Sequence, residues 1–423
     1  MTTSPAPGRR AKPSLAALAR TSALLGAIGF GGGISVLGQM RDALVVRRRW
    51  LTDREFDVTA TVAQMLPGGA AANALAYTGL RFHGPTGALV AYAAFIAPGA
   101  LLVAVLAALY VHVGVAPRLE PLLAGLNAAV VGVVVSITLQ MVRTAVARPW
   151  QMAVAASALL FASGGAASAG EVAAFGIGAG LVLDLVLKRF RLARIRRLGR
   201  RPSPPVALPD EGAPFLPPAE RAAPDDEAPP MRGPTRTPLP AAWLFGPASV
   251  GVLATMAILL VRAGLGAYGG GFAIIPNLKA TALSAHWLTE RQFADAVSIG
   301  KLTPGPVLLM ATFIGYLVHG ALGALVATVA VFSGPLLLVV AIGAWLARAR
   351  SRRSVRAALR GLTPAVVGLM AAAALTLGGS LQGPSEFAIA GAALLTLTRF
   401  RVNPVLVMAL GGVARLALRA AGI

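Results

Sequence analysis

Gly29-Phe30-Gly31-Gly32-Gly33 opens the stretch of this chain, residues 29–91, on which the prediction of its fold depends. The stretch continues through Trp50-Leu51-Thr52 and Pro67-Gly68-Gly69 and ends in Gly87-Ala88-Leu89. The same landmarks return later in the same order, at Gly269-Gly270-Gly271, Trp287-Leu288-Thr289 and Gly323-Ala324-Leu325. The offset between matching residues falls from 238 positions (31 to 269) to 236 (87 to 323), so two one-residue deletions explain it. An internal repeat of this length in an apolar chain predicts a transporter with two homologous halves.

The composition is typical of a polytopic membrane protein. Of the 423 residues, 56 % are apolar and only 13 % are charged, and the mean hydropathy is +0.73. Runs without a charged residue, such as 86–111 and 321–347, reach the roughly 20 residues that a spanning helix needs. We therefore predict an all-α membrane protein with about ten spanning helices, five in each half, together with broken and re-entrant helices.

The basic residues indicate the lipid bilayer, and not nucleic acid, as the partner of this chain. The formal net charge is +22, but the basic residues lie between the apolar runs and in one linker, which is the positive-inside pattern of a membrane protein. The linker becomes rich in proline and acidic residues and cannot bury a core. These changes in composition predict a polar tail (1–13), a first membrane repeat (14–187), a cytoplasmic linker (188–240) and a second membrane repeat (241–423). The sequence is also compatible with a homodimer.

The distribution of arginines predicts that the two halves are inverted in the membrane. Arginines gather in residues 41–49 and 348–360, whereas the equivalent loops of the opposite half, 279–286 and 112–124, hold at most one. Opposite bias requires an odd number of crossings in each half. Five crossings satisfy this if the proline-broken segments 58–80 and 293–317 are re-entrant hairpins. The alternative is a parallel arrangement in which six or more segments span in each half.

Breaks in the apolar segments mark the predicted site. Inside hydrocarbon each unpaired backbone polar group costs several kcal/mol, so a helix breaks only where protein, water or a ligand satisfies the freed groups. A pseudo-two-fold axis can bring the glycine-rich and the proline-glycine break of each half together near the membrane midplane. Helix N-termini carry free N–H groups and about half a positive charge, which suits an anion, although close packing or kinks are an alternative reason for the breaks. The predicted binding positions at the breaks are Gly31, Gly32, Gly33, Pro67, Gly68, Gly269, Gly270, Gly271, Pro304, Gly305 and Pro306.

Three polar side chains beside the breaks extend this predicted site: Gln64, Asn73 and Lys301. Lys301 precedes Pro304 by three positions, and its counterpart Gln64 precedes Pro67 by the same three. A lysine next to an intramembrane break is costly unless it is paired or hydrated, so Lys301 is a candidate anion ligand. The alternative is a lysine that extends from a helix end to the interface. Asn73 is an uncharged candidate for a hydrogen bond to the substrate.

Two further cations occupy equivalent positions outside the breaks. Arg41 and Lys279 each follow a glycine-rich break by eight positions. They are candidates for a funnel that guides anions towards the site. The alternative is that both are ordinary anchors at the membrane interface.

The sequence excludes most other chemistry. It has no cysteine and four scattered histidines, so we expect no metal site and no cofactor. It has neither a Walker A loop nor a Gly-x-Ser-x-Gly elbow, so we expect no enzyme activity. A proton-coupled carrier needs a carboxylate or histidine at membrane depth, and Asp57, Asp184 and Asp295 all lie near segment ends.

At these residues the sequence resembles the chromate ion transporter family, whose long members carry two homologous halves. The matching elements in the first half are Phe30-Gly31-Gly32, Arg48-Arg49-Trp50-Leu51, Glu55-Phe56, Gln64, Pro67-Gly68, Gly79 and Gly87-Ala88-Leu89. Those in the second half are Gly269-Gly270-Gly271-Phe272, Pro276, Trp287-Leu288-Thr289, Phe293, Thr303-Pro304-Gly305-Pro306, Thr312-Phe313-Ile314-Gly315-Tyr316 and Gly323-Ala324.

The resemblance implies a secondary transporter of the inner membrane that expels chromate or a similar oxyanion by using the proton motive force. Gly33 and Gly69 stand where the family has proline, and Lys301 replaces a usual glutamine. All three departures lie at the predicted site, so sulfate or an organic acid is an alternative substrate. A passive anion channel or a non-transporting membrane scaffold is the alternative of a different class.

Overall fold

The computed structural model describes residues 12–29, 33–113, 120–163, 167–198, 247–400 and 402–421, which form helices joined by short turns and contain no strand. The elements of the first half are α1 (Leu15–Ile28), α2 (Gly33–Arg41), the π-helical η1 (Asp42–Arg47), α3 (Asp53–Met65), α4 (Ala70–Val113), α5 (Glu120–Ala145), α6 (Pro149–Ser163) and α7 (Ala169–Leu198). Those of the second half are α8 (Pro247–Leu265), the 3₁₀ helix η3 (Gly269–Ile274), α9 (Ile275–Ser284), α10 (Glu290–Leu302), the 3₁₀ turn η4 (Val307–Leu309), α11 (Met310–Ala349), α12 (Arg353–Gly378), α13 (Pro384–Phe400) and α14 (Pro404–Ala420).

The same local signals build the same elements in both halves. Thr52 caps α3 and forms a capping box with Glu55, and Thr289 caps α10 and forms one with Gln292. Such a box satisfies two backbone N–H groups that would otherwise lack a partner at a helix start. The repeated stretch therefore encodes a repeated structure, as the sequence predicts.

A long helix in each half folds back on itself. α4 turns at His83-Gly84 and α11 turns at His319-Gly320, where the glycines have φ of +64° and +58°. The two arms of each helix touch directly, because a Cβ at Gly79 would lie 2.1 Å from the carbonyl oxygen of Gly87. In α11 the corresponding distance, from Gly315 to Gly323, is 2.3 Å. Both arms therefore need glycine at the crossing.

The proline-broken segments are re-entrant hairpins. Glu55, in the first turn of α3, pairs with Arg81 near the end of the first arm of α4, at 2.8 Å. In a continuous helix residues so far apart could not meet, so α3 and this arm are antiparallel. The hydrogen bond from the backbone N–H of Thr52 to the carboxylate, supported by Arg81, keeps the pKa of Glu55 below its usual value. The matching hairpin brings Gly300 of α10 against Met310 of α11.

The repeats run in opposite directions. Gly68, just before α4, contacts Pro335, and Tyr77 farther along the first arm of α4 contacts Gly343. This arm is therefore parallel to the second arm of α11, and the second arm of α4, which folds back, is antiparallel to it. Because these second arms are equivalent, the pseudo-two-fold axis is perpendicular to the helices. The structure confirms the inverted arrangement and contradicts the parallel alternative.

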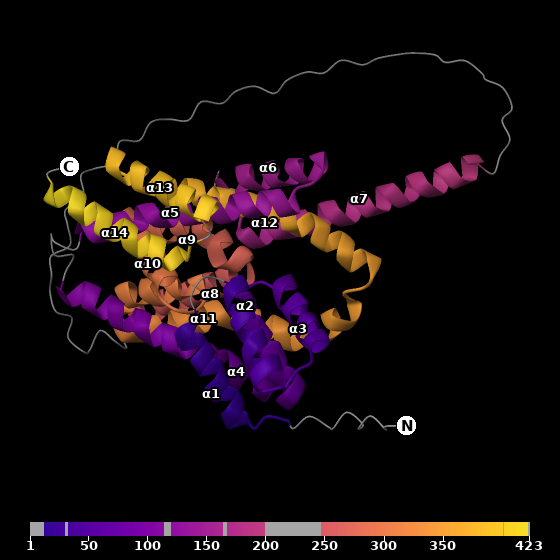
Figure 1. The fold of residues 1–423 in the computed structure, drawn as a ribbon, viewed down its shortest axis with the longest axis horizontal. Coiled ribbons are helices and arrows are strands. Elements are labelled where there is room, and N and C mark those ends of the chain that lie inside the picture. Colours follow the sequence, from indigo (N-terminus) through magenta and orange to yellow (C-terminus); the bar gives the residue numbers. More distant parts are fainter. Residues whose placement is uncertain are drawn as a thin grey trace, which may run out of the picture.

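The last three helices of each half pack against those of the other half. α12 packs against α6 and α7 of the first half, and α5 packs against α13 and α14 of the second. Figure 1 shows these six helices as one layer, with α1 to α4, α8 and α11 in a second layer. Glycines set the closeness of this packing, since a Cβ at Gly361 would lie 2.0 Å from the Gly176 oxygen, and one at Gly125 would lie 2.3 Å from the Gly411 oxygen. Small residues serve this purpose between membrane helices in general.

The described helices form a multi-pass membrane protein. Five of them are long and apolar enough to span a membrane: residues 70–112, 120–144, 169–186, 307–349 and 353–378. Large apolar side chains such as Leu101, Leu160 and Leu337 are exposed, as lipid-facing residues are. The total of about ten spanning helices stays a prediction, because the other apolar helices are shorter. The limits of the repeats and of the linker also stay predictions, and α7 continues beyond residue 187 to Leu198.

Candidate functional site

In the described residues, hydrogen bonds join each proline-glycine break to the chain beside a glycine-rich break. The N–H of Gly68 donates to the carbonyl of Ala267, which precedes the glycine-rich break of the other half, at 2.8 Å. Its symmetric counterpart is the bond from the N–H of Gly305 to the carbonyl of Gly29, at 3.2 Å. Each proline-glycine break is therefore tied to the chain that leads into the opposite glycine-rich break.

The two proline-glycine breaks face each other across the pseudo-two-fold axis. A Cβ at Gly69 would lie 3.0 Å from the Cβ of its own counterpart, Pro306. Gly68 lies against Pro335, and a Cβ at Gly99 would lie 2.4 Å from the carbonyl oxygen of Pro304. Because position 69 is a glycine and not a second proline, Pro306 can pack directly against it.

The glycine-rich break of the second half has a backbone that other residues rarely adopt. Gly269, Gly270 and Gly271 have φ of +63°, +77° and +98°. No atom lies within 4 Å of the Cβ position of Gly270, so this glycine borders open space. In the first half, Gly31 and Gly32 lie outside the described residues, and Gly33 is the first residue of α2.

Lys301 is a buried cation that forms no ion pair with any carboxylate in the described part of the chain. Its residue is 7 % exposed, and Nζ lies 5.2 Å from the centroid of the Phe272 ring, directly after the three glycines. In the described part of the chain no acidic side chain forms an ion pair with it. Its counterpart Gln64 is exposed, so the structure does not bring the two equivalent side chains into one site.

The side chain of Asn73 bonds to the backbone at the end of α3. It is fully buried, and Nδ2 reaches the carbonyl oxygens of Ala63, Leu66 and Pro67, which are freed where α3 ends. Its Oδ1 has no hydrogen-bond partner among the described residues. Asn73 therefore stabilises the break, and its remaining acceptor faces the backbone of Gly68, whose Cβ position lies 3.2 Å away.

The two candidate funnel residues are paired with carboxylates. Arg41 pairs with Asp53, and Lys279 pairs with Glu290 at 3.2 Å. In both cases the acid stands in the first turn of the next helix, α3 or α10. The pairs tie these helices together, as interface anchors do, and this weakens the attraction of either cation for an anion.

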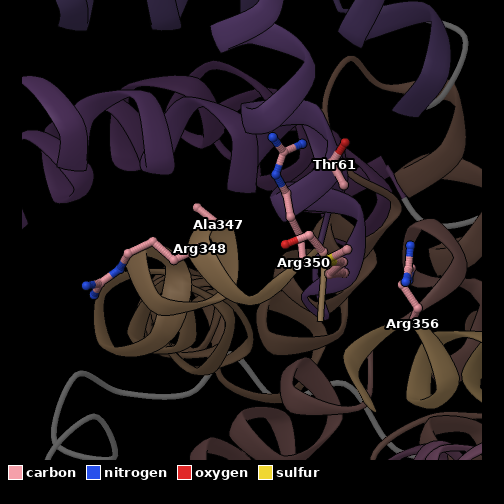
Figure 2. Close-up of a pocket in the computed structure, with 7 residues that line it drawn as sticks. Thr61, Ala347, Arg348, Arg350 and Arg356 are labelled. Carbon is pink, nitrogen blue, oxygen red and sulfur yellow. The ribbon is translucent and has the colours of Figure 1, made fainter. Parts of the chain in front are cut away.

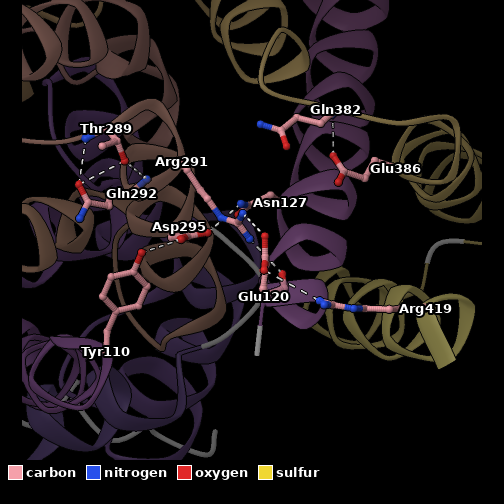
Figure 3. A network of polar contacts seen from close by, with 10 residues as sticks. All are labelled: Tyr110, Glu120, Asn127, Thr289, Arg291, Gln292, Asp295, Gln382, Glu386 and Arg419. Carbon is pink, nitrogen blue, oxygen red and sulfur yellow. Dashed lines mark hydrogen bonds and ion pairs between the residues drawn. The ribbon is translucent and has the colours of Figure 1, made fainter. Parts of the chain in front are cut away.

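Figure 3 shows a polar network on α10 that sequence reasoning missed. Asp295 is fully buried and accepts hydrogen bonds from Tyr110 Oη and Asn127 Nδ2, both at 2.9 Å. The hydroxyl of Ser298 donates to Asn127 Oδ1, and Arg291 pairs with Glu120. The network therefore fastens α10 to α4 and α5. Its partners are more than 160 positions away in sequence, so no local pattern could reveal it.

Sequence reasoning also missed a basic cavity beside α3, the first-half counterpart of α10. Figure 2 shows this cavity, which has a volume of about 370 Å³. Its lining residues come from α3, from the end of α11 and from the start of α12: Thr61, Met65, Ala347, Arg348, Arg350, Ser351 and Arg356. The six arginines of 348–360 indicated a cytoplasmic loop in sequence, but not that α3 would stand beside them.

Inverted membrane repeats with broken helices are an architecture typical of membrane transporters. The chain belongs to the chromate transporter family, since the family model matches residues 16–183 and 254–416, one segment in each half. This confirms the resemblance found in the sequence.

Individual relatives match over most of their length. A probable chromate transport protein of Synechococcus elongatus is 29 % identical over 88 % of this chain and 87 % of its own. The chromate transport protein of Cupriavidus metallidurans is 29 % identical over 84 % and 80 %, and that of Pseudomonas aeruginosa is 27 % identical over 92 % and 89 %. No solved structure matches this chain.

Proposed function

We propose that this protein is a secondary active carrier that exports chromate across the bacterial inner membrane, driven by the proton motive force. The observation that carries the proposal is the meeting of the breaks beside Lys301, a buried cation with no carboxylate partner in the described part of the chain. Relatives named as chromate transport proteins support the substrate. Those names also favour a carrier over an enzyme.

The arrangement suits a tetrahedral dianion because each break is followed by a helix N-terminus. α2, α4, η3 and the η4–α11 segment all begin at or directly after a break. Their first N–H groups carry partial positive charge, and they lie where hydrocarbon would otherwise surround them. In this proposal Lys301 supplies the full charge, and the amides at the breaks supply hydrogen bonds.

Another dianion, such as sulfate, is the competing substrate. Two of the departures from the family pattern, Gly69 and Lys301, lie among the residues that the structure brings together or beside them. A change of side chain at a binding site is a reason to test specificity directly. The experiment below therefore includes sulfate.

The test is chromate accumulation in everted membrane vesicles, in which the cytoplasmic face is turned towards the medium. Vesicles with the protein should accumulate chromate, an uncoupler should abolish the accumulation, and vesicles from cells with an empty vector should show neither. Flux that is insensitive to the uncoupler and does not saturate would indicate a channel. Absence of chromate flux with vesicles that do accumulate sulfate would replace the substrate, and absence of both would overturn the proposal.

A further inference from the structure

The two halves are equivalent in sequence but differ in how their hairpins pack. In the second half, α10 lies against α5 and is fastened there by the Asp295–Asn127, Ser298–Asn127 and Arg291–Glu120 contacts (Figure 3). By the repeat offsets, α3 is the counterpart of α10 and α12 is the counterpart of α5, so the equivalent pair is α3 and α12. That pair is not packed in this way. The basic cavity lies between α3 and the α11–α12 corner instead.

Matching positions show that the cavity and the network are counterparts. Thr61 in the cavity corresponds to Ser298 in the network at the offset of 237. Arg356 corresponds to Glu120 at the offset of 236. Because the repeats are inverted, these two places lie towards opposite faces of the membrane. One face is therefore open at the hairpin, and the other is closed by side-chain contacts.

The open place has the charge of an anion site. Arg348, Arg350 and Arg356 line the cavity, and none of them forms an ion pair with a described carboxylate, although Arg353 on the same corner pairs with Asp184 at 2.9 Å. The Arg348 guanidinium extends away from Arg350 in Figure 2, and its Nε donates to the carbonyl of Ala344, so Arg350 and Arg356 supply the charge of the cavity. The lining contains no acidic residue. Figure 2 shows the side chain of Arg350 extending towards the helix that carries Thr61. Unpaired guanidinium groups around a cavity bind tetrahedral oxyanions through several charge-assisted hydrogen bonds.

The cavity also adjoins the C-terminal end of α3, close in sequence to the proline-glycine break of the first half. Met65 lines it and is the last residue of α3, two positions before Pro67. An anion in the cavity is therefore at the end of the helix whose break reaches the pseudo-two-fold axis. Ser298, the counterpart of Thr61, is 1 % exposed.

We propose that this cavity, the Arg350 vestibule, is the site at which a divalent tetrahedral oxyanion is loaded before it reaches the broken-helix centre. The proposal rests on the function proposed above. It assigns the vestibule to the cytoplasmic side and the Asp295 network to the closed periplasmic side. A phospholipid headgroup carries the same phosphate chemistry, so the experiments separate a free oxyanion from a lipid.

The first experiment measures occupancy without transport. The chain has no cysteine, so Thr61→Cys provides a single thiol in the vestibule. We expect an anionic thiol reagent to label it faster than a neutral reagent of similar size, and sulfate to slow the labelling. Arg350→Gln together with Arg356→Gln should reduce the preference for the anionic reagent roughly 10-fold, whereas Arg352→Gln, on the same corner but outside the lining, should not.

Changing the lipid composition distinguishes a free oxyanion from a lipid headgroup as the ligand of the cavity. The labelling is repeated in nanodiscs of neutral lipid and in nanodiscs that contain phosphatidylglycerol. Protection by sulfate in both supports a site for free oxyanions. Protection that disappears with phosphatidylglycerol would show that a headgroup occupies the cavity, and it would overturn the proposal. Equal labelling rates for both reagents would overturn it as well.

The second experiment links the vestibule to transport. In everted vesicles the double arginine variant should raise the KM for chromate roughly 3- to 10-fold with little change in Vmax, and high salt should reduce the difference. A KM equal to that of the Arg352→Gln control would reject the loading role. Failure of the wild-type protein to transport chromate would instead reject the proposed function, and the labelling result would remain valid for sulfate.

Discussion

At the scale of single residues, Lys301 is the feature on which the proposed carrier function chiefly rests. An ammonium group in an apolar site is costly unless a partner compensates it. The Phe272 ring compensates only in part, because a cation–π contact is weaker than an ion pair with good geometry. The position therefore favours an anion as the missing partner.

Replacing this charge should impair transport while the fold remains intact. Lys301→Gln should lower kcat/KM for chromate roughly 10- to 100-fold, since a hydrogen bond to a charged group contributes about 1.5–3 kcal/mol. Vesicle uptake at matched protein levels measures this. Gln64→Lys is the control, because it places a lysine at the equivalent but exposed position. Unchanged uptake by Lys301→Gln would remove the residue from the site.

Asp295 gives a second prediction at the residue scale, and this one concerns stability. Asp295→Ala leaves the hydroxyl of Tyr110 and the amide of Asn127 buried without their acceptor. Each unsatisfied group costs about 1–3 kcal/mol, so the melting temperature in detergent should fall clearly. Asp57→Ala, an exposed aspartate on the equivalent helix, should leave it nearly unchanged. Equal melting temperatures for the two variants would contradict the network.

At the scale of elements, the re-entrant hairpin of the first half depends on Glu55. This carboxylate completes the capping box and pairs with Arg81, and its pKa is lower than in an unfolded chain. A lowered pKa means that the stabilisation is complete above the usual carboxyl range and is lost as the pH falls through the lowered folded value.

Hydrogen exchange of α3 measures this dependence. Protection of α3 should persist at pH 7 and decline only below the ordinary range of a glutamate. Glu55→Gln should lose most of that pH dependence, because a neutral amide does not titrate. A wild-type profile in the variant would show that Glu55 does not control the hairpin.

The helix crossings in the layer formed by α5 to α7 and α12 to α14 give another prediction at the scale of elements. A Cβ at Gly180 would lie 2.2 Å from the carbonyl oxygen of Ala357, so Gly180→Ala must separate α7 from α12. We expect a loss of about 1–3 kcal/mol, seen as a lower melting temperature. Gly178→Ala on the same helix meets no atom within 4 Å and should be neutral or slightly stabilising. Similar behaviour of the two variants would argue against this crossing.

Much of this architecture could be predicted from the sequence because it is encoded locally. The repeat, the breaks at Pro67 and Pro304, and the hairpins all follow from short patterns of glycine, proline and charge. The exposure of Gln64 and the burial of Asp295 could not be predicted, because both depend on which helix of the other half lies opposite. Repeat symmetry makes Gln64 and Lys301 equivalent, and the packing of the two halves exposes one and buries the other.

At the scale of the whole molecule, we interpret the difference between the two hairpins as one state of the alternating-access cycle of the proposed carrier. In the present state the Arg350 vestibule is open and the Asp295 network is closed. Exchange of these roles, by rocking of one layer against the other, would open the opposite face around a fixed central site.

Accessibility at paired positions checks this view. A single cysteine at Ser298 should react slowly with a water-soluble thiol reagent, whereas one at Thr61 should react quickly. A cross-link or substitution that holds the vestibule closed should reverse the order. Fast labelling at both positions under resting conditions would indicate a continuous channel and not a carrier.

The exchange of helices between the halves reaches beyond transport to the making of the protein. Neither α5 nor α12 has its main neighbours in its own repeat, so a ribosome that has completed only the first half has released helices whose partners do not yet exist. Until the second repeat is inserted, the surfaces of α5, α6 and α7 that will pack against it remain in contact with lipid. We expect a chain divided between Leu198 and Pro247 to assemble when both pieces are made in the same cell, because each piece brings the helices that the other packs against. Neither piece alone should form the native bundle.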